Sequence, residues 1–303
     1  MQYQSLPNCE KSIADIIILP IAHEDTVSAK VGTKDAPKAI LEASSQIEYY
    51  DELLDWSPMK HINICVETEL KKDSLQSIED FEKNIQNVVN EFDEKSFLIS
   101  LGGEHSITPM ISSSVLKEKA TIVFLDAHAD LRQTYQGSKY SHACPSHRLL
   151  EQGHKMIMIG VRSMFETEAI RVKEDENIEF FSDISMQKQE TKTKLLELLS
   201  SLEGEVYLSI DMDAFNPAYV PSVGTPQPGG LDLYIALDIL EKLFLNKNID
   251  IKAVDIVELI PEESNVSQVF AAKLLQKIIS YWGKSRGFDK KAKVGSQMQV
   301  DYE

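Results

Sequence analysis

Short apolar runs rich in β-branched residues recur along the whole chain, and they constrain its fold more than any other feature. Each run is bounded by turn residues or polar clusters, as expected of a strand. The runs predict eight strands, at residues 14–20, 61–66, 96–101, 121–126, 155–160, 177–181, 205–211 and 252–258. Several are apolar on both faces, which is typical of a parallel strand buried between two layers.

Segments with helical spacing lie between these strands. Residues 34–50 place Ala36, Ile40 and Ala43 on one apolar stripe, with Pro37 near the start of the helix. The same spacing predicts helices over residues 74–92, 187–202, 231–245 and 265–283. Alternation of strands and helices requires crossover connections, so the sequence predicts an α/β protein with a mostly parallel sheet and helices on both faces.

The chain has 303 residues and shows no internal repeat, low-complexity linker or shift in composition that would mark a domain boundary. We therefore expect a single domain over residues 1–285. Helical periodicity is lost after Tyr281, and residues 286–303 are predicted to form a polar C-terminal tail. Such a tail is expected to fray or to dock on a neighbouring subunit rather than to fold as a second domain.

Composition argues against several classes of protein. The formal net charge is −17, from 48 acidic and 31 basic residues, so neither nucleic acid nor an anionic membrane is an expected partner. Cys9, Cys65 and Cys144 form no C-x-x-C pair, which argues against a disulfide framework and a thiolate zinc site. A signal-peptide pattern and an apolar run of transmembrane length are both missing, so a cytoplasmic location is expected.

Phosphate-binding and serine-hydrolase motifs are missing too. No G-x-G-x-x-G follows the first predicted strand, and no G-x-x-x-x-G-K-[ST] occurs anywhere, so a dinucleotide or P-loop enzyme would lack its phosphate cradle. No G-x-S-x-G motif is present either, which removes the usual signal of a serine hydrolase.

Four of the predicted strands end in residues that could bind a metal ion, and in open parallel sheets ligands bind beyond the carboxyl ends of the strands. The candidates are His105, Asp126, His128, Asp130, Asp211, Asp213 and Glu258. The Gly102-Gly103 pair is expected to let the backbone turn sharply before His105. For any one group, a turn or N-cap aspartate with a satisfied histidine is the simpler explanation. All of them together, at strand ends of one sheet, favour a metal site.

The most informative group alternates with alanines. In extended chain this spacing puts the side chains of Asp126, His128 and Asp130 on one face. Burying three unpaired polar groups there would be costly unless a divalent cation supplied the compensating charge. Carboxylate and imidazole ligands suit manganese, iron or zinc. Two such ions that share carboxylates can hold a nucleophilic hydroxide between them at neutral pH.

Five segments together resemble the ureohydrolase family of arginases, agmatinases and their relatives, with agmatinases the most similar. The segments are LGGEHSIT (101–108), FLDAHADLR (124–132), SHACPSHRLLEQG (141–153), SIDMDAFNPAYVPSVGTPQPGGL (209–231) and AVDIVELIPEES (253–264). They occur in family order with family-like spacing. The N-terminal KVGTKDAPKAILEAS resembles the opening helix of the family, so the resemblance covers nearly the whole chain.

The resemblance implies an arginase-like, three-layer α/β/α fold around a central, mostly parallel eight-stranded sheet. It also implies two Mn²⁺ ions per subunit. One ion would be held by His105, Asp126, Asp130 and Asp211, and the other by His128, Asp213 and the shared Asp126 and Asp211. The hydroxide between them would attack the guanidinium carbon, and the ions would stabilise the tetrahedral intermediate.

The resemblance also assigns roles toward the substrate. Asp130 would orient the hydroxide, and Glu258 would bind the guanidinium group through two parallel hydrogen bonds. His142 matches the histidine that meets the substrate and transfers a proton. The alternative for His142 is an ordinary histidine of a surface loop. His147 and His154 are expected to be structural or surface residues.

The identity of the substrate is less well marked. Arginases bind the amino-acid head of arginine with a loop after D-A-H-A-D and with aspartates after a G-x-R segment, and RQTYQGSKYSHAC and GVRSMFETE show neither. A small cationic guanidino substrate without that head is therefore expected, with agmatine, cleaved to putrescine and urea, as the first candidate. The alternatives are guanidinobutyrate, aminopropylagmatine, guanidine, arginine and formiminoglutamate, or a relative of the family that has no activity.

Three departures from the family pattern are expected to affect specificity and to leave the metal site untouched. Asn216 stands where aspartate is frequent, although that position is not a metal ligand. Gln227 replaces a frequent glutamate, and Ser146 and His147 replace residues that are usually bulky and basic. Finally, the resemblance implies a homo-oligomer, either a trimer or a hexamer.

Overall fold

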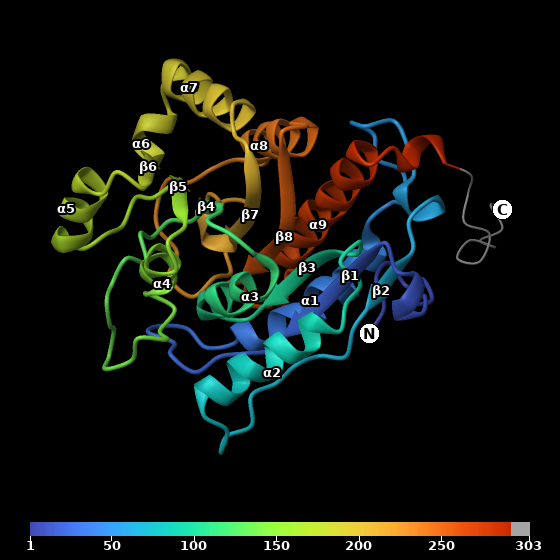
Figure 1. The fold of residues 1–303 in the computed structure, drawn as a ribbon, viewed down its shortest axis with the longest axis horizontal. Helices are drawn as coiled ribbons and strands as arrows, with labels where there is room; N and C mark the ends of the chain where they lie inside the picture. Colours follow the sequence, from blue (N-terminus) through green and yellow to red (C-terminus); the bar gives the residue numbers. More distant parts are fainter. Residues whose placement is uncertain (292–303) are drawn as a thin grey trace.

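The computed structural model describes residues 1–291, and its centre is one sheet of eight parallel strands (Figure 1). The strands are β1 (Ile16–Ile21), β2 (Ile64–Val66), β3 (Phe97–Gly102), β4 (Thr121–Leu125), β5 (Lys155–Ile159), β6 (Ile178–Phe181), β7 (Gly204–Asp211) and β8 (Ile249–Val257). They lie in the order β2-β1-β3-β8-β7-β4-β5-β6, and every neighbouring pair is parallel. The predicted α/β fold with a central sheet is confirmed, and the strand bounds differ from the predicted ones by a few residues.

Helices cover both faces, so the sheet is the middle of three layers. The α-helices are α1 (Ala36–Ala43), α2 (Ile78–Asn90), α3 (Thr108–Val115), α4 (Pro145–Glu151), α5 (Glu166–Glu174), α6 (Asp183–Met186), α7 (Gln189–Ser200), α8 (Leu233–Leu245) and α9 (Val266–Ser285). Ile16 and Ile18 of β1 pack in one apolar cluster with α1, α7, α8 and α9. Ile17 and Leu19 pack in a second cluster with α2, α3 and α4. Successive side chains of a strand point to opposite faces, so runs that are apolar throughout serve both cores.

The five predicted helices are present as α1, α2, α7, α8 and α9, with altered ends. The largest difference is at α1, because the chain continues only as a 3-10 turn to Gln46 and is extended at Ile47. Helices α3, α4, α5 and α6 lie outside the predicted ranges. Each has nine residues or fewer, and α3 reads TPMISSSV, so a long apolar stripe is missing from the sequence.

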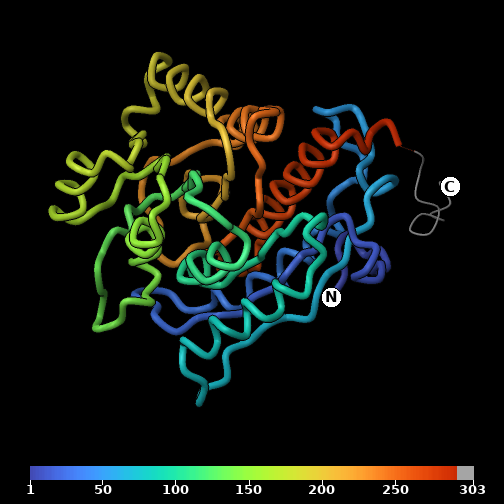
Figure 2. The backbone as a smooth tube through the Cα atoms, in the orientation of Figure 1, coloured from blue at the N-terminus to red at the C-terminus, as the bar shows by residue number. Residues whose placement is uncertain are grey.

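The last helix, α9, packs against elements from both the N-terminal and the C-terminal part of the described chain. Helix α9 lies beside α1 in the layer that covers one face of the sheet (Figure 2). Beyond α9, Phe288 is buried and its ring centre lies 5.3 Å from that of Trp282, so the first part of the predicted tail packs on its own chain. Residues 292–303 lie outside the described residues. Within residues 1–291, none of the helices combines the length and the apolar character needed to cross a bilayer.

The order of the strands creates a place for a ligand. β3 and β4 are consecutive in sequence, yet β8 and β7 lie between them in the sheet. The chain connections therefore diverge on either side of this central group of strands. In open parallel sheets, ligands bind beyond the carboxyl ends of the strands at such a switch point.

Candidate metal centre and active-site cleft

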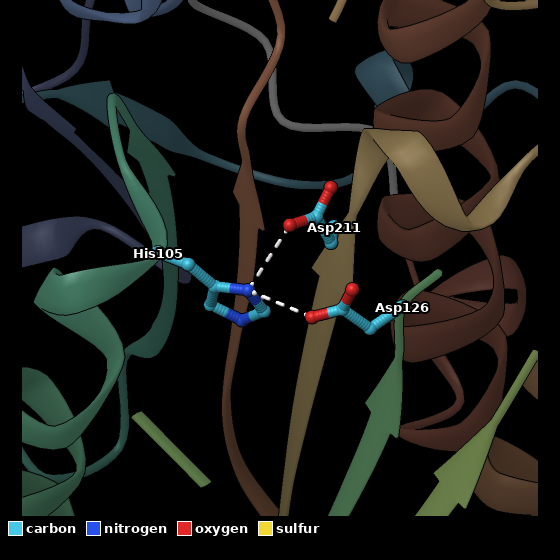
Figure 3. A group of neighbouring side chains, drawn as sticks. All are labelled: His105, Asp126 and Asp211. Atoms are coloured by element: carbon cyan, nitrogen blue, oxygen red, sulfur yellow. Dashed lines mark hydrogen bonds and ion pairs between the residues drawn. The ribbon is translucent and has the colours of Figure 1, made fainter. Parts of the chain in front are cut away.

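Three buried side chains meet at the carboxyl ends of β3, β4 and β7 (Figure 3). His105 opens the short 3-10 helix that follows β3, Asp126 follows β4 directly, and Asp211 is the last residue of β7. The Nδ1 atom of His105 lies 3.1 Å from Asp126 Oδ2 and 3.1 Å from Asp211 Oδ2. We call these three residues the first cluster. Their ligand atoms lie within 4.8 Å of one another, close enough to hold a metal ion.

A second cluster, made of Asp126, His128 and Asp213, adjoins the first and shares Asp126 with it. His128 Nδ1 lies 2.9 Å from Asp213 Oδ2 and 3.7 Å from Asp126 Oδ1. Backbone groups fix the carboxylates: Asp126 Oδ1 accepts from the N–H of His128 at 2.6 Å, and Asp213 Oδ1 accepts from that of Ala127 at 3.0 Å. The Asp213 N–H donates to Asp211 Oδ1 at 2.7 Å, which ties the two clusters together.

Asp130 and Glu258 lie at the margins of the clusters. Asp130 Oδ2 is 3.6 Å from His105 Nδ1, and Glu258 Oε1 accepts from the backbone N–H of His105 at 2.6 Å. Both residues have a positive φ, +51° for Asp130 and +65° for Glu258. Residues other than glycine rarely adopt a positive φ, and those that do concentrate at functional sites. All seven candidate ligands of the sequence analysis are therefore brought to one end of the sheet.

The hydrogen bonds around His105 test whether a cation fits. Asp255 is fully buried, and its Oδ1 accepts from Ser209 Oγ at 2.6 Å. The Ser209 proton is thus engaged, so Ser209 Oγ accepts from His105 Nε2 at 2.8 Å. The lone pair of the neutral ring is then on Nδ1, which faces only carboxylates. Asp126 Oδ2 is buried and accepts no hydrogen bond from residues 1–291. A lone pair directed at unpaired carboxylate oxygens fits a metal ion.

Negative charge is crowded at this point. Burial, together with Asp213 and Asp126, raises the pKa of Asp211 well above its ordinary value. Burial and Asp126 do the same to the pKa of Asp130. Burial disfavours a charged ring at His105, but the carboxylates of Asp126 and Asp130 outweigh it and raise the pKa of His105 to about 9. The protein alone does not balance this charge, and divalent cations would do so.

Both clusters contribute to the lining of a cleft of about 280 Å³, a size that suits a small molecule: Asp211 from the first, and His128 and Asp213 from the second. The lining residues are Ser28, His128, Ala129, Asp130, Arg132, Tyr135, His142, Ala143, Ser163, Met164, Phe165, Glu168, Asp211, Asp213, Thr225 and Glu258. His142 comes from the segment between β4 and α4, and its ring packs edge-on against Tyr135 at 5.8 Å. Burial lowers the pKa of His142, which favours the neutral ring near pH 7. The three residues predicted to act on the substrate, Asp130, His142 and Glu258, all line this cleft.

The remaining residues singled out from the sequence lie in different places relative to the cleft. Gln227 Nε2 lies 3.5 Å from His128 Nε2, so this departure does contact a candidate metal ligand. Ser146 and His147 do not line the cleft. His154 is buried, and its Nδ1 accepts from the N–H of Ala120 at 3.1 Å, a structural contact.

The two glycines before His105 serve another purpose than the expected sharp turn. Neither Gly102 nor Gly103 has a positive φ. A Cβ at Gly103 would overlap the carbonyl oxygen of His23, and one at Gly102 would overlap Ile107 and Val257. The glycines therefore permit close packing of the segment that carries His105.

Several residues of the site were not singled out from the sequence. Ser209 and Asp255 lie inside buried strands, where a polar residue within an apolar run is the signal that could have identified them. Glu104 is also buried, and its carboxylate accepts from backbone and side-chain donors of the loop after β1. No local pattern marks Thr26, the loop residue whose hydroxyl meets both Glu104 and His142.

Comparison with known proteins agrees with this geometry. The family model described as “Arginase family” matches residues 14–280. The chain belongs to the arginase family. An N(1)-aminopropylagmatine ureohydrolase of Synechocystis is 34% identical over 282 residues, which are 90% of each chain. An agmatinase of Pyrococcus horikoshii is 35% identical over 285 residues, covering 90% of this chain and 94% of the relative. The solved agmatine ureohydrolase of Thermoplasma volcanium is 29% identical, with a TM-score of 0.79 over 92% of this chain and 93% of that one.

Membership of the arginase family defines the class of reaction. The chain is a ureohydrolase, a hydrolase acting on C–N bonds, and it is similar to both agmatinases and aminopropylagmatine ureohydrolases. The resemblance stated from the sequence is confirmed. In this arginase-family enzyme, the two His/Asp clusters lie at the carboxyl ends of the central strands and could bind metal ions.

Proposed function

We propose that this enzyme hydrolyses agmatine to putrescine and urea, with two manganese ions in each subunit. The observation that carries the proposal is that one small cleft is lined by Glu258 together with members of both His/Asp clusters, namely Asp211 of the first and His128 and Asp213 of the second. A carboxylate that can bind a guanidinium group therefore lies next to a place for cations that activate water. The partner of the enzyme is a small cationic molecule, and the predicted homo-oligomer stays a prediction.

Glu258 binds the guanidinium group in this proposal. Its Oε1 already accepts from the N–H of His105, whereas its Oε2 accepts no hydrogen bond from residues 1–291. Each carboxylate oxygen has two lone pairs, so both oxygens can accept from the guanidinium. Charge-assisted bonds of this parallel kind fix orientation as well as position. The guanidinium carbon would then be presented to the floor of the cleft.

The candidate ligands divide between two ions. His105, Asp126, Asp130 and Asp211 would hold one, and Asp126, His128, Asp211 and Asp213 the other. Carboxylates and imidazoles without a thiolate are the ligands that manganese accepts. A pair of divalent cations supplies a nucleophile at neutral pH and stabilises negative charge as it develops. Asp130 would accept a hydrogen bond from the attacking water and so fix its direction.

His142 completes the reaction by protonating the leaving amine. Water adds to the guanidinium carbon, the bond from that carbon to the substituted nitrogen breaks, and the nitrogen leaves as the amine of putrescine. The departing nitrogen needs a proton, and an imidazole with an accessible pKa can carry it from the attacking water. The place of His142 in the wall of the cleft supports this role.

The outer wall of the cleft supports a linear substrate. Tyr135, Met164 and Phe165 offer apolar surface for a chain of methylene groups. Glu168 also lines the cleft, but its two oxygens accept from the backbone N–H groups of Leu131 and Phe165. It is therefore not arranged to bind an α-amino group. The similarity to aminopropylagmatine ureohydrolases makes aminopropylagmatine the second candidate.

A urea-release assay across guanidino compounds tests the proposal. The full chain is assayed with arginine, agmatine, aminopropylagmatine, guanidinobutyrate and guanidine, each with and without added Mn²⁺. We expect the highest kcat/KM with agmatine and no turnover after chelation. Faster urea release from arginine than from agmatine would reject the proposed substrate, and a higher kcat/KM with aminopropylagmatine would select the second candidate.

A further inference from the structure

The loop that follows β1 reaches across to His142. The backbone N–H of His142 donates to Thr26 Oγ1 at 3.0 Å, and the ring atom Nδ1 lies 3.1 Å from the same oxygen. The other ring atom, Nε2, lies 3.3 Å from Ser28 Oγ. Both nitrogens of the ring are thus in contact with hydroxyl groups of one short loop, although more than 100 residues separate that loop from His142 in the sequence.

Glu104 holds this loop in place. It is 1% exposed, and its Oε2 accepts from the N–H groups of Asp25 at 2.9 Å and Thr26 at 2.8 Å. Its Oε1 accepts from Thr26 Oγ1 at 3.0 Å and from Ser106 Oγ at 2.6 Å. Four donors thus meet the two oxygens of Glu104, and none of these contacts needs a proton on its carboxyl group. Glu104 is therefore a carboxylate that only accepts hydrogen bonds.

The direction of each hydrogen bond follows from that fact. Thr26 has one hydroxyl proton, and the carboxylate of Glu104 takes it. The remaining lone pairs of Thr26 Oγ1 can only accept, and both the backbone N–H and the ring atom Nδ1 of His142 are in range. The proton of the neutral ring must then be on Nδ1 for the contact at 3.1 Å to be a hydrogen bond. A ring with its proton on Nε2 would place two lone pairs against each other.

We propose that Thr26 is a positioning residue that fixes the tautomer of His142, with the proton on Nδ1 and the lone pair of Nε2 available on the side of Ser28. Ser28 lines the cleft and can donate to that lone pair until substrate arrives. Burial lowers the pKa of His142, which agrees with a neutral ring. This role rests on the proposed function: Nε2 of His142 accepts the proton from water and passes it to the leaving amine.

Kinetics of matched variants test the role of the Thr26 hydroxyl. Thr26→Val removes the hydroxyl and keeps the shape, whereas Thr26→Ser keeps the hydroxyl. We expect kcat for urea release to fall by about 10- to 100-fold in Thr26→Val, because an acid–base step loses part of its contribution, with little change in KM. Thr26→Ser should restore kcat, and bound manganese should be the same in all three proteins. A Thr26→Val enzyme with wild-type kcat, or one altered only in KM, would overturn the proposal.

A spectroscopic measurement tests the tautomer independently of activity. The full chain is prepared with ¹⁵N-labelled histidine and with Zn²⁺, a diamagnetic cation, and the ring signals of His142 are assigned with His142→Asn. We expect the Nδ1–H tautomer in the wild type and a shift toward Nε2–H in Thr26→Val. An Nε2–H ring in the wild type would overturn the proposal even if Thr26→Val failed to fold. Absence of urea release from every guanidino compound would instead refute the proposed function.

Discussion

Replacing Asp255 by asparagine should weaken metal binding at the first cluster without touching a ligand. Asp255 lies beneath the site and accepts from the hydroxyls of Thr108, Tyr207 and Ser209 at 2.8, 2.8 and 2.6 Å. Ser209 in turn accepts from His105 Nε2, which leaves Nδ1 free of a proton and able to bind a cation. The free energy of metal binding therefore depends on where the Ser209 proton goes.

The size of the effect follows from one hydrogen bond. The asparagine side chain offers one acceptor oxygen where the carboxylate offered two. Ser209 must then compete with Thr108 and Tyr207, and the loss of a buried hydrogen bond costs about 1–3 kcal/mol. If Ser209 instead donates to His105 Nε2, the ring proton moves to Nδ1, where the cation would bind. Such a penalty weakens binding by about 5- to 150-fold.

Equilibrium dialysis against Mn²⁺, with metal analysis, measures this change. Tyr207→Phe is the matched control, because Tyr207 donates to Oδ2 of Asp255 and leaves the bond from Ser209 to Oδ1 in place. We expect Asp255→Asn to raise the Kd for one of the two ions, and Tyr207→Phe to lower thermal stability without changing the Kd. Equal Kd values for wild type and Asp255→Asn, or equal weakening in both variants, would refute the reasoning.

Two further predictions concern the clusters and the fold. Asp126→Ala should abolish urea release and lower bound manganese, because both clusters share Asp126. Asn216→Asp, the control, should change activity little, since an aspartate oxygen can accept the same hydrogen bond from the Ala218 N–H. Activity in Asp126→Ala comparable to that of the wild type would count against the mechanism. Lys277→Met should lower the free energy of unfolding, measured by urea denaturation, by about 3–5 kcal/mol. The reason is that buried Asp51 would lose the ammonium group that lies 2.7 Å away. An unchanged midpoint of the urea unfolding transition would contradict this prediction.

The fold and the ligand positions were accessible from the sequence for a simple physical reason. Buried parallel strands must be apolar on both faces, so each strand is recognisable from about six residues, and the ends of such strands meet at one edge of the sheet. Asp126 and Asp211 stand directly at those ends, and their convergence with His105 follows once the sheet is known. Helix α3 was missed because TPMISSSV lacks a long apolar stripe.

The surroundings of the ligands were not accessible in the same way. The role of Asp255 depends on which hydroxyl groups face it, and those come from β7 and α3, far away in sequence. Thr26 contacts His142 because hydrogen bonds to Glu104 hold the loop after β1 in place beside it. Such contacts arise from tertiary packing, and no local periodicity encodes them. The same limit explains Gln227, which was expected to leave the metal site untouched and lies beside His128.

Anomalous diffraction at the manganese absorption edge, from crystals of the full chain grown with Mn²⁺, tests the central claim most directly. We predict two peaks in each chain. One should lie among His105, Asp126 and Asp211, and the other among Asp126, His128 and Asp213. A chain that releases urea from agmatine but shows no manganese at these clusters, or manganese only elsewhere, would contradict the account.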